Sequence, residues 1–170
     1  MNKPIRVLKV LGSTGLGGAE NMVFNYYLGM DKSKVQFDFL LHKKDKSRRD
    51  DLIKNLGGKV FYVPTIKPAN LFKYRKALKA FFQEHNYQIV HSHINAYGYW
   101  ALKEAKKHNV PVRIAHSHTS IEPFWKKVFL KNKKWSATFK ELVQSFLKYF
   151  LLKHTTHFFA CGKKAGIWLF

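Results

Sequence analysis

Six short runs of apolar residues, each bounded by turn-forming residues, recur along the chain, and segments of helical length separate most of them. A strand buried on both faces reads as a short continuous apolar run. Strands that alternate with helices every 25 to 30 residues or so are typical of strand–helix–strand units. The pattern therefore predicts an α/β fold with a parallel sheet covered by helices on both faces. The predicted strands are residues 5–11, 35–41, 59–63, 87–93, 110–118 and 156–161, and the clearest helices are 19–30, 49–56, 71–84 and 97–108.

Residues 139–151 show a regular amphipathic pattern. Apolar side chains recur at helical spacing, and the remaining positions are mostly charged or polar. We expect a helix whose apolar face packs on the sheet. The apolar face comprises Phe139, Leu142, Val143, Phe146, Leu147, Phe150 and Leu151, and the opposite face Lys140, Glu141, Gln144 and Lys148.

The last residues predict a further helix that begins near Lys163. No capping residue, glycine or charged tail follows it before Phe170, and natural helices usually end with such signals. We therefore expect residues 1–170 to form one domain of a longer protein, truncated before a second domain.

The charge of the chain is its most unusual global property. Among 170 residues, 31 Lys and Arg against 10 Asp and Glu give a net charge of +21. Such a surplus indicates an anionic partner, which could be nucleic acid, a membrane surface or a phosphorylated substrate. The single Cys161 excludes an internal disulfide and a cysteine-rich zinc site. No run reaches the ~18 apolar residues of a membrane-spanning helix and no signal peptide opens the chain, so we expect a cytoplasmic protein.

The stretch LGSTGLGGAENMVF places four glycines between the first predicted strand and the first helix. It is not a nucleoside-triphosphate loop, because the positions that would need Lys and Ser or Thr are Gly18 and Ala19. It also fits the dinucleotide fingerprint poorly, because the third glycine would be Glu20 and the nearest acidic residue, Asp38, lies inside the second strand.

What remains is a loop in which Gly17 and Gly18 let backbone N–H groups face a phosphate, next to the positive end of a helix dipole. The alternative is a tight strand-to-helix turn without a ligand. Glu20 favours a functional loop, because its position in the first helical turn directs it toward the crevice at the strand ends.

Two histidine pairs, in VHSHINA and IAHSHTS, follow consecutive predicted strands. Residues two apart on a strand share a face, so adjacent strands would bring the four imidazoles together. Three interpretations stay open: a zinc site built from three of them, buried structural histidines, or ligands for substrate hydroxyls. We favour a mixture in which His91 and His116 are structural and His93 and His118 emerge from the strand ends to bind substrate.

Taken in order, the segments GLGGAENMVFNYY, KVQFDFLLH, IVHSHINA, VRIAHSHTS and FFACGKKAGIWLF resemble the amino-terminal domain of retaining GT-B glycosyltransferases of the bacterial capsule and exopolysaccharide type. The resemblance runs over nearly the whole chain. It implies one Rossmann-like, acceptor-side half of a two-domain enzyme, whose other half holds most of the nucleotide sugar.

The resemblance also implies roles for individual residues. Gly17 and Gly18 would approach the donor diphosphate, and His118, in the H-T-S stretch, would act as the catalytic residue near the reacting carbon. The acceptor-binding candidates are Glu20, His93, Asn95 and Thr119.

The implied reaction transfers a sugar with retention and needs neither a metal nor another cofactor. Loop N–H groups would stabilise the leaving diphosphate. A double displacement would need a carboxylate nucleophile, for which Glu20 is the candidate, but the family implies front-side transfer. The family's paired glutamates lie in the other domain, so we expect this fragment to be inactive alone.

The segment PFWKKVFLKNKKW interleaves aromatic residues with lysines, a pattern typical of the membrane interface. We expect it to bind an anionic membrane and to place the enzyme at the inner face of the cell membrane, near a lipid-linked acceptor. Two other functions remain alternatives: nucleic-acid binding, although no such motif is present, and an NAD(P)-dependent oxidoreductase. The membrane candidates are Trp125, Lys126, Lys127, Lys133, Lys134 and Trp135.

Overall fold

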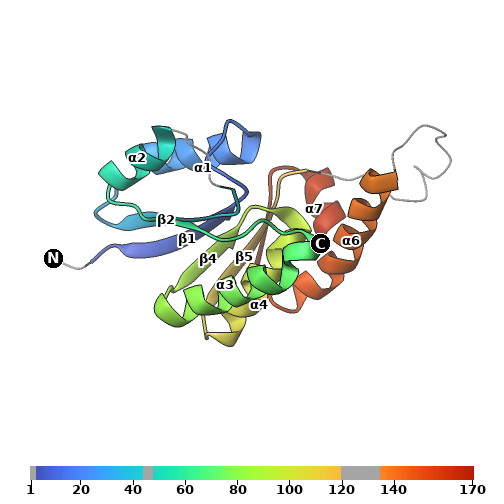
Figure 1. Ribbon diagram of the computed structural model, residues 1–170. Coiled ribbons are helices and arrows are strands. Elements are labelled where there is room, and N and C mark those ends of the chain that lie inside the picture. Colours follow the sequence, from blue (N-terminus) through green and yellow to red (C-terminus); the bar gives the residue numbers. More distant parts are fainter. Residues whose placement is uncertain (1–2, 44–47, 120–134) are drawn as a thin grey trace.

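The computed structural model describes residues 3–43, 48–119 and 135–170, with only the backbone for residues 48 and 135–141. Within these residues, a six-stranded parallel sheet has the strand order β3-β2-β1-β4-β5-β6 (Figure 1). The fold class predicted from the apolar runs is confirmed. The strands are β1 (Ile5–Leu11), β2 (Val35–Leu41), β3 (Val60–Tyr62), β4 (Ile89–Ser92), β5 (Val112–Ser117) and β6 (His157–Ala160).

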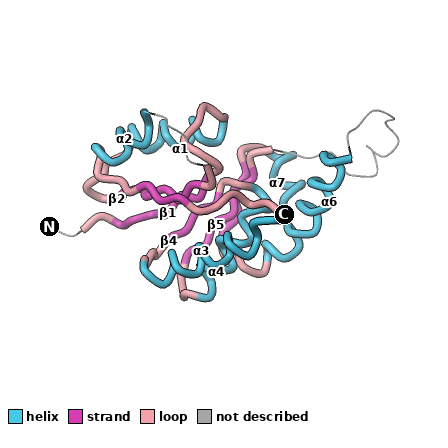
Figure 2. Tube along the Cα trace, in the orientation of Figure 1, coloured by secondary structure: helices cyan, strands magenta, loops and turns pink. Residues whose placement is uncertain are grey.

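Helices cover both faces of this sheet (Figure 2). One core joins Leu8, Val10 and Val90 of the sheet to α3, α4 and α6, and a second joins Phe39 and Leu41 to α1 and α2. The alternating faces of β1 and β2 therefore feed two separate cores. The helices are α1 (Gly18–Gly29), α2 (Arg48–Asn55), α3 (Leu71–Glu84), α4 (Tyr99–Lys107), α6 (Trp135–Leu152) and α7 (Lys163–Leu169), with short 3-10 turns η1 (Pro68–Asn70) and η2 (Asn95–Gly98). No helix among the described residues is long and apolar enough to cross a membrane.

The predicted amphipathic helix forms as α6, but its faces differ from the expectation. Val143, Leu147 and Leu151 pack into the core, whereas Leu142 is 45% exposed. Gln144, expected on the polar face, is buried. The reason is that α6 is covered on more than one side: α7 adds its Leu169 to the same core, and Lys148 of α6 donates to the carbonyl of Trp168 in α7.

The strand order places a topological switch point between β1 and β4. From β1 the chain proceeds outward to β2 and β3, and from β4 it proceeds outward in the other direction to β5 and β6. Ligands of open parallel sheets bind beyond the carboxyl ends of the strands at such a point. The loops that follow β1 and β4, on either side of it, are the glycine-rich loop and the first histidine pair.

Candidate functional site

The glycine loop, residues 12–18, leads from the end of β1 into α1. Helix α1 begins at Gly18, and the carbonyl of Gly17 accepts the first helical bond from Asn21 N at 2.8 Å. Neither glycine has a positive φ. The loop therefore does not owe its glycines to a left-handed backbone.

Space around the two glycines separates their roles. A Cβ at Gly17 would collide with the carboxylate of Glu20, which folds back over the loop, whereas a Cβ at Gly18 would meet nothing within 4 Å. Both glycines are exposed. A side chain at position 17 would therefore displace the Glu20 carboxylate from the loop, and position 18 is free for a close approach from outside.

Helix α2 braces the glycine loop from the side. The Arg49 guanidinium donates to the carbonyl of Gly15 at 2.7 Å and to the side-chain oxygen of Asn21 at 2.6 Å. The Thr14 hydroxyl donates to Asp50 at 2.6 Å. The sequence analysis missed Arg49 and Asp50, because nothing in the local pattern connects α2 with a loop more than thirty positions earlier.

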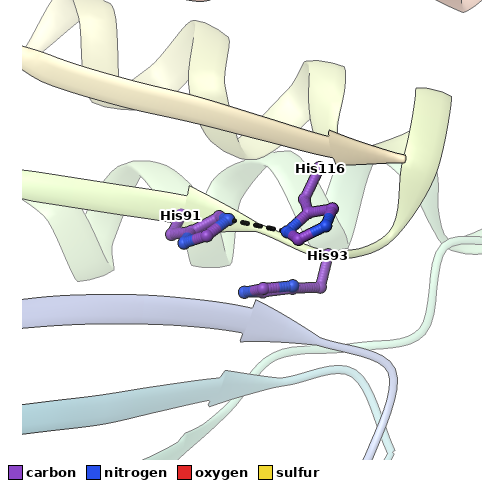
Figure 3. A group of neighbouring side chains, drawn as sticks. All are labelled: His91, His93 and His116. Carbon is purple, nitrogen blue, oxygen red and sulfur yellow. Dashed lines mark hydrogen bonds between the residues drawn. The ribbon is translucent and has the colours of Figure 1, made fainter. Parts of the chain in front are cut away.

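The four histidines of the two HSH stretches lie together at the ends of β4 and β5, as predicted. Nε2 of His91 lies 3.2 Å from Nδ1 of His116, and Nδ1 of His93 lies 2.9 Å from Nε2 of His118. Figure 3 shows the rings of His91, His93 and His116 facing one another. The rings of His91 and His93 stack with centroids 4.0 Å apart, and those of His116 and His118 with centroids 4.2 Å apart. We call these four residues the histidine cluster.

Lys9 of β1 joins this cluster from the neighbouring strand. It is the register partner of His91 across the β1–β4 ladder, and its Nζ lies 2.9 Å from Nδ1 of His91. When Lys9 carries its charge, its ammonium can only donate, so in that state His91 accepts at Nδ1, carries its proton on Nε2 and donates to His116. The lysine thereby selects one tautomer of His91.

Burial lowers the pKa values of the four histidines and of Lys9. Burial, with the charge of Lys9 second, lowers the pKa of His91 to about 2, and burial with His118 second lowers that of His116 to about 4. Burial also lowers the pKa of His118 and, more strongly, that of His93. The pKa of Lys9 falls to about 7 for the same reason. The imidazoles are therefore neutral at pH 7 and act as hydrogen-bonding groups.

One expectation for the cluster was wrong. His93 does not emerge from the sheet: it is only 4% exposed, less than His91 or His116. Its neighbours account for this, because the rings of His91, His116 and His118 all lie against it. Of the two residues expected to face substrate, His118 alone is partly exposed.

The same cluster has a spacing that a metal ion could use. A ring nitrogen from each of His91, His93 and His116 lies within 4.8 Å of the others. The contacts of His91 argue against a metal, because its Nδ1 already meets the Lys9 amine and its Nε2 meets His116. Metal-bound imidazoles usually donate their second N–H to a carboxylate or carbonyl. These residues do not fit a metal centre, and its absence stays a prediction.

Asn95 clamps the two loops that carry the histidines. Its amide donates to Thr119 Oγ1 at 3.0 Å and accepts from the backbone N–H of His118 at 3.1 Å. It adopts a left-handed backbone with φ 49°, which Asn tolerates better than most residues. The structure thus brings three predicted site residues, Asn95, His118 and Thr119, into direct contact.

A cavity of about 230 Å³ lies beside these loops, lined by Gly12, His42, Ile66, Ile94 and Tyr97. His42 follows β2, and its ring bridges the carbonyl of Leu11, at 2.7 Å, and the hydroxyl of Tyr74, at 2.8 Å. Because a carbonyl can only accept, Nδ1 of His42 carries the proton. We call this hollow the edge cavity.

Asp38 cannot serve a dinucleotide ribose. Its carboxylate lies inside β2, is 1% exposed, and pairs with Arg6. It also accepts from Tyr87 Oη at 2.9 Å. In its NAD-dependent form, the oxidoreductase alternative therefore lacks the acidic residue that it needs at the second strand.

The predicted membrane residues lie outside the described side chains. Residues 125–134 are not described, and of Trp135 only the backbone is described, at the start of α6.

Comparisons with known proteins identify the family of the chain. Residues 16–167 match the family model described as Glycosyltransferase Family 4. The putative glycosyltransferase EpsF of Bacillus subtilis (strain 168) is 38% identical over 166 residues, which cover 97% of this chain and 41% of that protein. The chain thus spans about two fifths of the length of this curated relative.

Among solved structures, leucoanthocyanidin reductase from Vitis vinifera in complex with NADPH has a TM-score of 0.51 at 16% identity, over 89% of this chain and 48% of that one. MurG of Acinetobacter baumannii has a TM-score of 0.47 at 12% identity, over 66% of this chain and 34% of that one. At 16% identity, the likeness to the reductase shows the Rossmann-like fold alone. The match to the family model extends over most of the residues, and the chain belongs to glycosyltransferase family 4.

Proposed function

We propose that this chain is the amino-terminal, acceptor-side half of a GT-B glycosyltransferase. The complete enzyme transfers a sugar, with retention, from a nucleotide-sugar donor to a lipid-linked acceptor in the synthesis of bacterial exopolysaccharide or capsule. The observation that carries the proposal is the meeting of the glycine loop and the histidine cluster at the switch point of the sheet. The name of the Bacillus relative, EpsF, supports the glycosyltransferase activity.

The glycine loop receives the donor diphosphate. Gly18 opens α1 and has free space where a side chain would stand, so a phosphate can approach the first N–H groups of the helix. Gly17 gives room to the Glu20 carboxylate, which lies toward Gly12 at the crevice. Glu20 then serves the acceptor, whose hydroxyls a carboxylate can bind.

His118 stands closest to the reaction. It is neutral and partly exposed, and its ring is fixed by His93 while its backbone is fixed by Asn95. A neutral imidazole can donate to or accept from a sugar hydroxyl without adding charge. Asn95 and Thr119 border the acceptor, while the buried His93 holds the ring of His118 in place.

The other half of the enzyme supplies what this chain lacks. Under the proposal, the paired glutamates that engage the donor sugar belong to that half, so this chain alone is inactive. No metal takes part, and loop N–H groups together with basic residues of the other half stabilise the leaving diphosphate. The enzyme acts at the inner face of the cell membrane, held there by the basic aromatic segment.

The test uses the complete protein and a panel of nucleotide sugars, with transfer followed by isotope incorporation and the anomeric configuration of the product by NMR. His118→Ala is expected to lower turnover by about tenfold or more, with unchanged circular dichroism. His108→Ala is the matched control, because His108 lies at the far end of α4 and binds the carbonyl of Glu104. Wild-type turnover in His118→Ala would remove His118 from the site, and an inverted product would refute retention.

The membrane part of the proposal has its own test. Replacing Lys126, Lys127, Lys133 and Lys134 by Ser is expected to weaken co-sedimentation with anionic vesicles, because each basic residue near such a surface contributes about 1 kcal/mol. A duplex DNA competitor separates the nucleic-acid alternative. Unchanged co-sedimentation would refute membrane binding by this segment.

A further inference from the structure

A second cavity, larger and almost wholly apolar, lies between α6 and the segments η1 and η2. Its volume is about 400 Å³, within the roughly 300–1,000 Å³ of pockets that hold small organic ligands. We call it the apolar cavity. Its walls are Ile66, Lys67, Pro68, Leu71, Tyr97, Trp100, Val143 and Leu147.

The apolar cavity adjoins the edge cavity. Ile66 and Tyr97 line both hollows. The edge cavity in turn touches Gly12 at the end of β1 and Ile94 in the loop that carries His93. A ligand could therefore place one end at the strand ends, among the proposed sugar-binding groups, and its other end among aliphatic and aromatic side chains.

Two basic residues lie at or near the apolar cavity. Lys67, next to Ile66 in the chain, lines it and is exposed. The Arg75 guanidinium lies 5.5 Å from the ring centroid of Trp100, a residue of the cavity wall. Arg75 also lines a neighbouring basic hollow with Lys76, Lys79 and Lys107. Phe72, beside it on α3, is 82% exposed.

The polar strand ends, Lys67 and the apolar cavity together match a ligand in which a phosphate joins a sugar to a hydrocarbon chain. Sugar hydroxyls suit the polar strand ends, a phosphate suits Lys67 at the junction, and only a hydrocarbon chain gains by entering walls without polar partners. A free sugar or an oligosaccharide would leave the apolar cavity unused.

The geometry points to the apolar cavity as the binding site for the hydrocarbon chain of the acceptor, with Lys67 at the phosphate that joins this chain to the sugar. The identification of the ligand as the acceptor rests on the proposed function. The binding of the chain and phosphate does not depend on donor or on transfer, so it can be tested separately.

The experiment titrates the protein with farnesyl phosphate below its micellar concentration and follows binding by calorimetry. Inorganic phosphate and farnesol, each carrying half of the chemistry, are titrated in parallel. We expect saturable binding of farnesyl phosphate at one site, no measurable binding of phosphate alone, and weaker binding of farnesol. Lys67→Gln should bring the Kd for farnesyl phosphate closer to the Kd for farnesol, because it removes the cation that binds the phosphate.

A pair of adjacent substitutions on α6 locates the site. Val143→Trp fills the cavity and should raise the Kd for farnesyl phosphate by about tenfold or more, which corresponds to the loss of about two buried methylene groups. Leu142→Trp is the matched control, because Leu142 directly precedes Val143 and is exposed to solvent. Its Kd for farnesyl phosphate should stay within about twofold of the parent value. Leu71→Gln, which makes the wall polar without adding bulk, should also weaken binding, and it covers the case in which Val143→Trp fails to fold.

The results distinguish a failure of this inference from a failure of the proposed function. Absence of saturable binding, unchanged binding in both Val143→Trp and Leu71→Gln, or an equal loss in Leu142→Trp would overturn the inference. A dimer that dissociates on Val143→Trp would assign the cavity to a second copy of the chain and would also overturn it. Binding with the expected pattern in a complete protein that transfers no sugar would support the cavity while refuting the proposed function.

Discussion

The histidine cluster makes the stability of this domain depend on pH below about 6.5, the ordinary pKa of histidine. His91, His93 and His116 are buried and neutral in the native state, with pKa values lowered by burial to about 2 for His91 and about 4 for His116, and strongly lowered for His93. In the unfolded chain the same residues bind protons as the pH falls through about 6.5. The unfolded state then holds more protons, so the free energy of unfolding decreases as the pH is lowered.

The size of the effect follows from these values. At pH 5.5 an imidazole with an unfolded pKa of about 6.5 gains RT ln 11, about 1.4 kcal/mol, in the unfolded state and almost nothing in the native state. The three buried imidazoles together should lower the free energy of unfolding by about 4 kcal/mol when the pH falls from 7.5 to 5.5. That is a large part of the roughly 5–15 kcal/mol that stabilises a typical domain. Lys9, with its pKa lowered to about 7, acts in the same direction over an overlapping window, because it adds stability as the pH rises from about 6 toward its unfolded pKa of about 10.4.

Urea unfolding at pH 7.5 and at pH 5.5, followed by circular dichroism, measures this difference. His91→Gln removes one of the three groups and should reduce the change in unfolding free energy by about 1.4 kcal/mol, whatever its effect at a single pH. His157→Gln is the matched control, because His157 is exposed on β6, and should leave the change as in the parent. A pH dependence in His91→Gln equal to that of the parent would refute the view that His91 is held neutral in the fold.

Two further predictions concern the glycine loop and the buried ion pair. Gly18→Ala should leave the stability of the domain unchanged or raise it by about 0.4–1 kcal/mol, because the added Cβ meets nothing within 4 Å. In the complete protein the same substitution should raise the KM for the donor by about tenfold. An unchanged KM would mean that no phosphate approaches Gly18. Asp38→Asn should cost about 1–3 kcal/mol in thermal or urea unfolding, because it removes the charge that the guanidinium of Arg6, 34% exposed, pairs with at the buried Asp38. Asp31→Asn, at an exposed pair with Lys34, should cost less than about 1 kcal/mol, and equal costs would contradict the importance of burial.

The fold could be predicted from the sequence because its strands are buried on both faces. Runs such as IRVLKVL and VQFDFLL appear in the structure with the predicted bounds, as β1 (Ile5–Leu11) and β2 (Val35–Leu41). The meeting of the two histidine pairs was also predictable, because side chains two apart on parallel strands point the same way. Both conclusions rest on short-range periodicity.

The interior of the site could not be predicted, because it depends on partners distant in the sequence. Lys9 meets His91 only through the β1–β4 register, 82 residues along the chain. A lysine inside an apolar strand is a signal of a special environment, but it does not say which side chain it faces. The burial of His93 and of Gln144 likewise comes from rings and helices that no local pattern locates.

Within the described part of the chain, the neutral histidines of the site lie apart from the exposed basic residues beside the apolar cavity, and this arrangement suits the proposed reaction. Glycosyl transfer passes through a transition state with positive charge on the sugar ring, and a protonated His118 beside it would oppose that charge. Burial lowers the pKa of His118, and the three other imidazoles around it are neutral as well. Meanwhile exposed basic residues such as Lys67, Arg75 and Lys76 lie on the surface beside the apolar cavity, where they can attract a phosphate without reaching the sugar. Neutral hydrogen-bonding groups at the strand ends and cations at the periphery are thus the arrangement that an acceptor with a sugar at one end and an anionic lipid at the other requires.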